Sequence, residues 1–183
     1  ANKFITGFSR LIRLTLEISA KPKITLQEEI DFLTAYLELE KKRFARRFDY
    51  RIMADDTIDR EEFQIPPMVL QPYIENSVRH GIRYREDNAG LISINFLIKN
   101  DYLLCTIEDN GIGRVRSKQL KGHNKIEYQS RGMALTAKRI DLMNRNHEVP
   151  ILIDVEDIYK EKIPAGTKVI LHFPIKEMNK PVS

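Results

Sequence analysis

The stretch from Glu75 to Gly81 (ENSVRHG) carries residue types that could bind a charged ligand. Arg79 and His80 follow Asn76 by three and four residues, so one side of an expected short helix presents all three. An amide oxygen can coordinate a hard cation such as Mg²⁺, and a guanidinium offers several donors to phosphate oxygens. The alternative is a surface ion pair between Glu75 and Arg79, with Asn76 in solvent. This segment alone favours neither interpretation.

A second candidate is Asp109-Asn110-Gly111-Ile112-Gly113, at the end of an expected strand. Two glycines one residue apart let backbone approach a flat ligand closely, and an aspartate can accept a hydrogen bond from an exocyclic amine. The alternative is an ordinary turn, because Asn-Gly is a routine turn dipeptide. The stretch matches neither the Gly-Lys-Ser/Thr phosphate loop nor the three-glycine dinucleotide pattern.

Two further stretches could contact a nucleotide. Ser130 to Leu135 is rich in small residues and is predicted to begin a helix, whose free N–H groups would stabilise phosphate oxygens. Gly166-Thr167 is predicted to begin the last strand, where a hydroxyl could reach a ligand. The alternatives are ordinary helix capping by Ser130 and a simple turn bond at Thr167.

Apolar residues at helical spacing predict two helices in the first quarter of the chain. One spans about residues 4–20, and the other begins at a Thr25/Glu28 capping box and runs to about Arg47. The apolar stripe of the second helix is wide enough to pack against another helix, from this chain or a second copy. From Phe48 the hydrophobic period changes to two, which predicts a strand and a domain boundary between residues 47 and 48.

The rest of the chain alternates between expected strands and helices. A long polar, basic loop is expected at residues 114–130, and a frayed tail from residue 176. The remaining predictions are a helix over 68–80, strands over 91–99 and 102–109 joined by a turn at 100–101, a helix over 131–144, and strands over 151–156 and 168–173.

The composition describes a globular chain and excludes several classes of protein. Of 183 residues, 42% are hydrophobic and 31% charged, with 8 Gly and 8 Pro, which excludes collagen-like and wholly disordered chains. A net charge of +4 is too small to indicate nucleic-acid binding. The single cysteine, Cys105, allows neither an intramolecular disulfide nor a cysteine metal cage, and favours a cytoplasmic location. A sequence that starts at Ala1 without methionine suggests a fragment, so a membrane segment could lie upstream.

In chain order, these motifs resemble the ATP-binding superfamily of gyrase, heat-shock chaperones, histidine kinases and MutL. The motifs that carry the resemblance are Glu75-Asn76-x-x-x-His80-Gly81, Asp109-x-Gly111-x-Gly113, Gly132-x-Ala134-Leu135 and Gly166-Thr167. Further matches resemble one branch, the LytS-type sensor histidine kinases of bacterial two-component systems: residues 24–30, Tyr36-Leu37-Glu38, Arg43-Phe44 and residues 65–72. This resemblance covers nearly the whole chain.

The resemblance implies a Bergerat-type α/β (α+β) two-layer sandwich, in which helices cover one face of a mixed sheet and two helices precede it. Residues 1–47 would be a helical dimerisation or connector segment, and residues 48–183 the ATP-binding catalytic domain. Asn76 would ligate Mg²⁺, Asp109 would bind the adenine amino group, and Glu75 would be a candidate base. The other expected nucleotide-binding residues are Arg79, His80, Asn110, Gly111, Gly113, Arg131, Gly132, Ala134, Leu135, Gly166 and Thr167, and residues 114–130 would form a lid with Lys118 and Lys121 as phosphate contacts.

The resemblance also implies that ATP and Mg²⁺ are the cofactors and that the phosphoryl group passes to a histidine and then to a response-regulator aspartate. The family carries its phosphoacceptor histidine before the first helix, in a segment this sequence lacks. The chain is therefore expected to bind ATP without phosphorylating itself, to form a homodimer through its helices, and not to bind nucleic acid.

Three alternatives to this function stay open from the sequence. The family has glycine where Ala134 stands, so the chain could be a nucleotide-sensing scaffold of the same fold without kinase activity. An ATP-hydrolysing clamp of the gyrase or MutL kind would share the motifs. A nucleic-acid-binding protein would need a concentrated basic face.

Overall fold

The computed structural model describes residues 2–45, 48–83, 85, 89–114 and 123–180. Its centre is a five-stranded mixed sheet in the order β2-β4-β5-β7-β6. The strands are β2 (Phe48–Ala54), β4 (Gly90–Lys99), β5 (Tyr102–Asp109), β6 (Leu152–Lys160) and β7 (Ile163–Pro174). β2 is parallel to β4, and the other neighbours are antiparallel.

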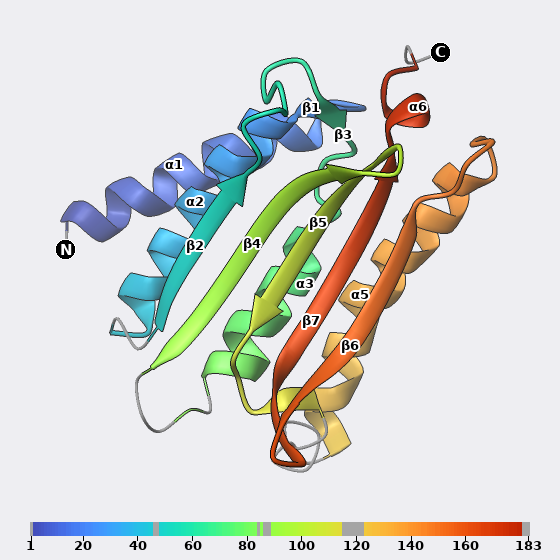
Figure 1. The fold of residues 1–183 in the computed structure, drawn as a ribbon. Coiled ribbons are helices and arrows are strands. Elements are labelled where there is room, and N and C mark those ends of the chain that lie inside the picture. The colour runs from blue at the N-terminus through green and yellow to red at the C-terminus, as the bar shows by residue number, and fades with distance from the viewer. Residues whose placement is uncertain (1, 46–47, 84, 86–88, 115–122, 181–183) are drawn as a thin grey trace.

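Helices cover one face of this sheet, as predicted. Figure 1 shows α2 (Leu26–Arg43), α3 (Gln71–Asn76) and α5 (His123–Asn144) behind the strands, with no described helix over the opposite face. The inward residues of β4 and β5 alternate with outward ones, and Ile92, Ile94, Leu103, Cys105 and Ile107 are fully buried under the helices. The mixed sheet with helices on one face confirms the predicted fold class.

The two predicted N-terminal helices are present. α1 (Asn2–Ser19) packs on α2, and a short pairing of β1 (Ile24–Thr25) with β3 (Gln64–Ile65) follows α1. The Thr25 hydroxyl accepts from the Glu28 N–H at 3.1 Å, and Glu28 accepts from the Thr25 N–H at 2.9 Å, so the capping box is confirmed. Leu33 and Leu37 of α2 belong to the same buried cluster as Ile94 and Phe96 of β4, and the division at residues 47 and 48 stays a prediction.

The helix expected over residues 68–80 differs from the structure at both ends. α3 begins at Gln71 and is followed by a π-helix, η1 (Ser77–Ile82), so Gly81 lies within helical structure and does not end it. Short π-helical turns widen the backbone and occur frequently at functional sites. Here the widened turn carries the residues that follow Asn76.

Two other segments correct the predictions. α5 begins at His123, not near Arg131, because residues 123–131 contain neither glycine nor proline and include several good helix formers. Residues 176–178 are not a frayed tail, because they lie in α6 (Ile175–Met178), whose Met178 is buried in the core. The predicted turn between β4 and β5 is confirmed, with positive φ at Asn100 and Asp101.

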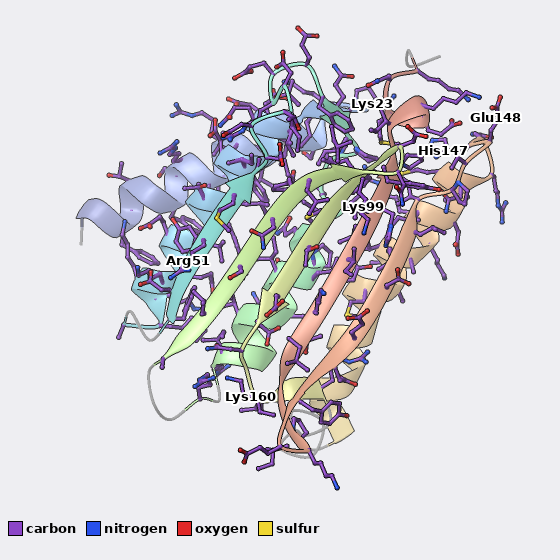
Figure 2. The ribbon with its side chains drawn as sticks, viewed as in Figure 1. Lys23, Arg51, Lys99, His147, Glu148 and Lys160 are labelled. Carbon is purple, nitrogen blue, oxygen red and sulfur yellow. The ribbon has the colours of Figure 1, made fainter. Side chains whose placement is uncertain are left out.

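The two ends of the sheet carry different features. Lys23, Lys99, His147 and Glu148 lie at the end near α6, while Lys160 lies at the opposite end, where β6 turns into β7 (Figure 2). The end of β5 and the start of β7 are at this second end, as is the π-helix η1 (Figure 1). Three of the motifs singled out in the sequence therefore meet at one end of the sheet.

Candidate functional site

Asp109, the last residue of β5, is the centre of the candidate site. Its side chain is buried, with 2% exposure, and both of its carboxyl oxygens are engaged. The Ser77 hydroxyl donates to Oδ2 at 2.9 Å, and the Gly111 N–H donates to Oδ1 at 2.9 Å. The backbone of Thr167, its cross-strand neighbour on β7, also bonds to the carboxyl group. Asp109 is thus held in one orientation by three separate segments.

Three glycines allow these segments to pack so closely. A Cβ on Gly81 would lie 2.5 Å from Asp109 Oδ1, and one on Gly111 would lie 2.2 Å from the Gly81 backbone. Gly166 has a φ of +148°, and a Cβ there would lie 2.0 Å from the Asp109 carbonyl oxygen. Any side chain at these positions would force the segments apart. The glycines that the sequence singled out at 111 and 166, together with Gly81, build one compact corner.

The burial of Asp109 tunes its proton affinity. Burial raises the pKa of Asp109 to about 6, and the hydrogen bonds from Ser77, Gly111 and Thr167 act in the opposite direction by stabilising the anion. The carboxyl group is therefore mostly ionised at neutral pH, although it is almost fully removed from water. An oriented carboxylate in a closely packed corner can accept a hydrogen bond from the amino group of a flat ligand.

Asn76 connects this corner to α5. Its side-chain Nδ2 donates to the Met133 sulfur at 2.6 Å, and Met133 directly follows Gly132. The motifs around residues 76 and 132, which are far apart in the sequence, therefore meet in the structure. No group of three or more His, Cys, Asp or Glu side chains that could hold a metal ion occurs among the described residues. Mg²⁺ commonly binds through few protein ligands and the phosphates of its nucleotide, so an amide such as Asn76 fits that ion.

The other residues of the motif from 75 to 81 are placed as follows. Glu75 Oε1 accepts from Gln71 Nε2 at 2.9 Å, and Arg79 is exposed. The described part of the chain contains no ion pair between Glu75 and Arg79, so that alternative is not realised. The side chain of His80 lies outside the described residues.

Asn110 has a structural role. Its Oδ1 accepts from the Leu91 N–H at 2.7 Å, and its Nδ2 donates to the Ala89 carbonyl at 3.0 Å. Its own carbonyl accepts from Arg85. The amide thus ties the end of β5 to the start of β4, and its hydrogen-bonding atoms are used for that purpose.

The predicted phosphate cradle at the start of a helix is wrong as a structural element. Because α5 begins at His123, residues 131–135 lie within the helix, where backbone N–H groups bond to preceding carbonyls. Ala134 and Leu135 are exposed, while the side chains of residues 123–132 and all of residues 115–122 lie outside the described residues, with Arg131, Lys118 and Lys121 among them. Phosphate contact by residues 131–135 stays a prediction.

Sequence reasoning missed four residues that complete the site: Ser77, Met133, Arg114 and Asp157. Arg114 directly follows Gly113 and pairs with Asp157 on β6. Ser77 directly follows Asn76 within the motif, so its position was a usable signal. Met133 lies within the stretch from Ser130 to Leu135 that the sequence singled out, although no contact of its side chain was predicted. Asp157 gave no signal, because only the packing of β6 brings it to the site.

Comparisons with known proteins show similarity to sensor histidine kinases. A family model described as histidine kinase matches residues 1–48. The sensor protein LytS of a Staphylococcus epidermidis strain is 34% identical over 113 residues, which is 62% of this chain and 19% of that protein. LytS of Staphylococcus haemolyticus is 29% identical over all of this chain and 28% of its own length. The chain thus spans less than a third of these relatives.

Solved structures of similar fold are also histidine kinases. The histidine kinase domain of a blue-light-activated kinase from Erythrobacter litoralis has a TM-score of 0.56 at 14% identity, covering 96% of this chain and 81% of that domain. Histidine kinase ThkA, in a complex with the response regulator protein TrrA, has a TM-score of 0.53 at 14% identity, covering 98% of this chain and 50% of that one. None of the helices described for this chain is long and apolar enough to cross a membrane.

Proposed function

We propose that this chain, the ATP-binding region of a LytS-type sensor histidine kinase, binds Mg-ATP and supplies its γ-phosphoryl group to a histidine elsewhere in the protein. A response-regulator aspartate would then receive the group. The observation that carries the proposal is the corner around Asp109, where donors from η1, from β7 and from the turn just after Asp109 hold one buried carboxyl group. Such a corner suits an adenine ring, which is flat and carries an exocyclic amine.

In this proposal Asp109 accepts a hydrogen bond from the adenine amino group, and Ser77 fixes the carboxylate in place. Gly111 and Gly166 keep the surrounding backbone close, so little water remains beside the ring. The base is thereby placed at one end of the sheet, which orients the phosphates toward α3 and α5. Positioning of this kind is the main contribution of a protein to phosphoryl transfer.

Asn76 would hold the metal ion and Arg79 would contact the phosphates, both from the α3–η1 segment. When bound, Mg²⁺ neutralises the negative charge on the phosphate oxygens. Asn76 Oδ1 is the ligand atom in this scheme, because a hard cation binds oxygen lone pairs and the amide nitrogen is only a donor. Glu75, held by Gln71, is the candidate base near the transferred group.

Calorimetric titration with ATP, with and without Mg²⁺, tests these assignments. We expect Asp109→Asn to weaken ATP binding about tenfold to a hundredfold, because the adenine amino group then donates to a neutral amide and no longer to a charged carboxylate. Asn76→Ala should remove the dependence of binding on Mg²⁺ while leaving metal-free binding intact. Asn95→Ala, an amide deletion on the open face of β4, is the control and should change neither quantity. Unchanged behaviour in the first two variants contradicts the proposal.

The partners belong to the same proposal. α1 exposes the large apolar side chains of Phe4, Ile5, Phe8, Ile12 and Leu16, which suits a homodimer formed through the helical segment. A response regulator is proposed as the downstream partner, and the region is placed in the cytoplasm because its nucleotide is there. Sedimentation equilibrium of the chain and of Phe8→Asp tests the dimer, which the charge should disrupt.

A scaffold of the same fold without kinase activity is the second candidate. It is favoured by α5, which runs unbroken through residues 131–135 and offers no free N–H groups there. Phosphohistidine formation by a longer form that contains the acceptor histidine separates the two. If that form binds ATP but forms no phosphohistidine, the scaffold is correct.

A further inference from the structure

Arg114 and Asp157 form a two-pronged ion pair beside the candidate site. Arg114 Nε lies 2.7 Å from Asp157 Oδ1, and Nη2 lies 2.9 Å from Oδ2, so two parallel hydrogen bonds join the groups. Donation to the Asp157 carboxylate raises the pKa of Arg114. This fork-to-fork geometry fixes direction as well as distance, unlike a single contact between charges.

The pair joins two segments that are 43 residues apart in sequence. Arg114 directly follows Gly113, whose φ is +74°, at the end of the segment that begins with Asp109. Asp157 lies on β6 directly opposite Thr167 of β7. The pair therefore spans from the segment after β5 to the outer strand of the β6–β7 hairpin.

The hairpin that Asp157 anchors is one wall of the corner around Asp109. The register of β6 and β7 shifts at Ile158 and Tyr159, immediately after Asp157, and bulges of this kind redirect side chains next to functional sites. Across from the irregularity, Pro164 lies so close to Gly113 that a Cβ there would be 2.8 Å from the proline Cβ. Gly166 packs against the Asp109 carbonyl. A movement of the hairpin would thus reach Asp109.

We infer that Arg114 and Asp157 are positioning residues for the nucleotide base, because they hold the β6–β7 hairpin against the segment that carries Asp109. This inference rests on the proposed function and adds two residues to the base-binding side of the site. Neither residue needs to touch the nucleotide. Their effect passes from Gly113, which packs on Pro164, to Gly166, which packs on the Asp109 main-chain carbonyl, and to Thr167, whose backbone bonds to the Asp109 carboxyl group.

A neighbouring ion pair provides a matched control. Lys168 of β7 and Glu156 of β6 form an ion pair within the hairpin, one residue along β6 from Asp157, through a single contact of 4.0 Å. Partly exposed pairs contribute little to folding stability, so neither pair is expected to hold the fold together. If any ion pair on the hairpin were sufficient, loss of either pair would affect the site equally. The inference assigns the effect to Arg114 and Asp157 alone.

The experiment measures ATP and GTP affinity by calorimetry, with and without Mg²⁺, together with thermal unfolding. We expect Asp157→Asn and Arg114→Lys each to weaken ATP binding about tenfold, because each variant loses the paired geometry. The preference for ATP over GTP should fall, while the dependence on Mg²⁺ and the unfolding temperature should stay as in the unmodified chain. Glu156→Gln should leave all four quantities unchanged. The double variant Arg114→Asp/Asp157→Arg, which swaps the two charges, should recover part of the ATP affinity that the single variants lose.

Two results would overturn the inference. Unchanged ATP affinity in Asp157→Asn would show that the pair is an ordinary surface contact. Weaker binding in Arg114→Lys with normal binding in Asp157→Asn would show that the arginine contacts the nucleotide directly. The first titration, of ATP into the unmodified chain, tests the proposed function separately. If that chain does not bind ATP, the proposed function itself is contradicted.

Discussion

Two buried carboxyl groups, Asp109 at the end of β5 and Glu29 in α2, occupy environments that differ in one respect. Both side chains are removed from water, with 2% and 0% exposure. Asp109 receives hydrogen bonds from three segments, whereas neither oxygen of Glu29 has a hydrogen-bond partner among the described residues. Burial raises the pKa of both, to about 6 for Asp109 and about 8 for Glu29.

Asp109 and Glu29 show that burial alone does not determine whether a carboxyl group is charged at neutral pH. Donors around Asp109 stabilise its anion, so the group stays ionised at neutral pH and can act as an acceptor. Glu29 has only apolar surroundings and the buried Cys105 thiol near enough to interact electrostatically, so it stays mostly protonated at neutral pH. A buried acid therefore stays available as an anionic acceptor at neutral pH when the fold also supplies donors to its charged form.

The largest expected effect concerns Glu29. Its pKa is higher in the folded chain than its ordinary value of 4.5, so its contribution to stability is fully present below pH 4.5. As the pH rises from 4.5 through about 8, the unfolded chain loses this proton first, and about 5 kcal/mol of stability is lost. Glu29→Gln removes this loss. Denaturant unfolding at pH 4 and pH 9 should give a variant about as stable as the unmodified chain at pH 4 and several kcal/mol more stable at pH 9.

A control for this prediction is Glu38→Gln on the same helix, where Glu38 accepts from the Tyr50 hydroxyl at 2.7 Å. Because this carboxyl group is half-exposed and has a hydrogen-bond donor, Glu38→Gln should not show the gain in stability at pH 9 that is expected for Glu29→Gln. ATP affinity should be normal in Glu29→Gln, because Glu29 lies outside the corner around Asp109. If the free energy of unfolding depends on pH equally in Glu29→Gln and in the unmodified chain, the proposed difference between Glu29 and Asp109 is contradicted.

A smaller effect is expected at Ser77. Ser77→Ala removes the donor to Asp109 Oδ2, and a hydrogen bond to a charged group contributes about 2 kcal/mol. The pKa of Asp109 should rise further, because its anion loses a stabilising bond. ATP affinity should therefore fall about tenfold at pH 6, with a smaller loss at pH 8, where the carboxyl group is ionised in both proteins. A loss that does not depend on pH would show that Ser77 acts on the nucleotide directly.

The fold was largely predictable because its elements follow local rules. The capping box at Thr25 and Glu28 and the change of hydrophobic period at Phe48 depend on neighbouring residues, and both appear in the structure. The start of α5 and the helix α6 were not predicted. The segment from residue 123 is polar, so hydrophobic periodicity did not reveal its helix although several of its residues are good helix formers. α6 is too short for periodicity, and its helical structure depends on tertiary packing.

The candidate site was predictable only in part. Asp109, Gly111 and Gly166 stood out because glycine and aspartate at strand ends have specific backbone uses, and the structure brings them together. The pairing of Arg114 with Asp157 links residues 43 apart, so no local spacing encodes it. Of the donors to Asp109, only the Gly111 N–H is local; the other two come from Ser77 of η1 and Thr167 of β7, and only the folded topology brings them there.

The smallest expected effect tests whether α2 stabilises the fold without affecting nucleotide binding at the corner around Asp109. Thr25→Ala removes one half of the capping box at the helix that carries Glu29, and loss of such a cap costs about 1 kcal/mol. ATP affinity should stay normal, because Asp109 receives its donors from other segments. Thr34→Ala is the control, since the Thr34 hydroxyl only bonds back to the Ile30 carbonyl within the helix. Chemical denaturation should show a lower midpoint for Thr25→Ala alone, and a parallel loss of ATP affinity would mean that α2 and the corner around Asp109 are coupled.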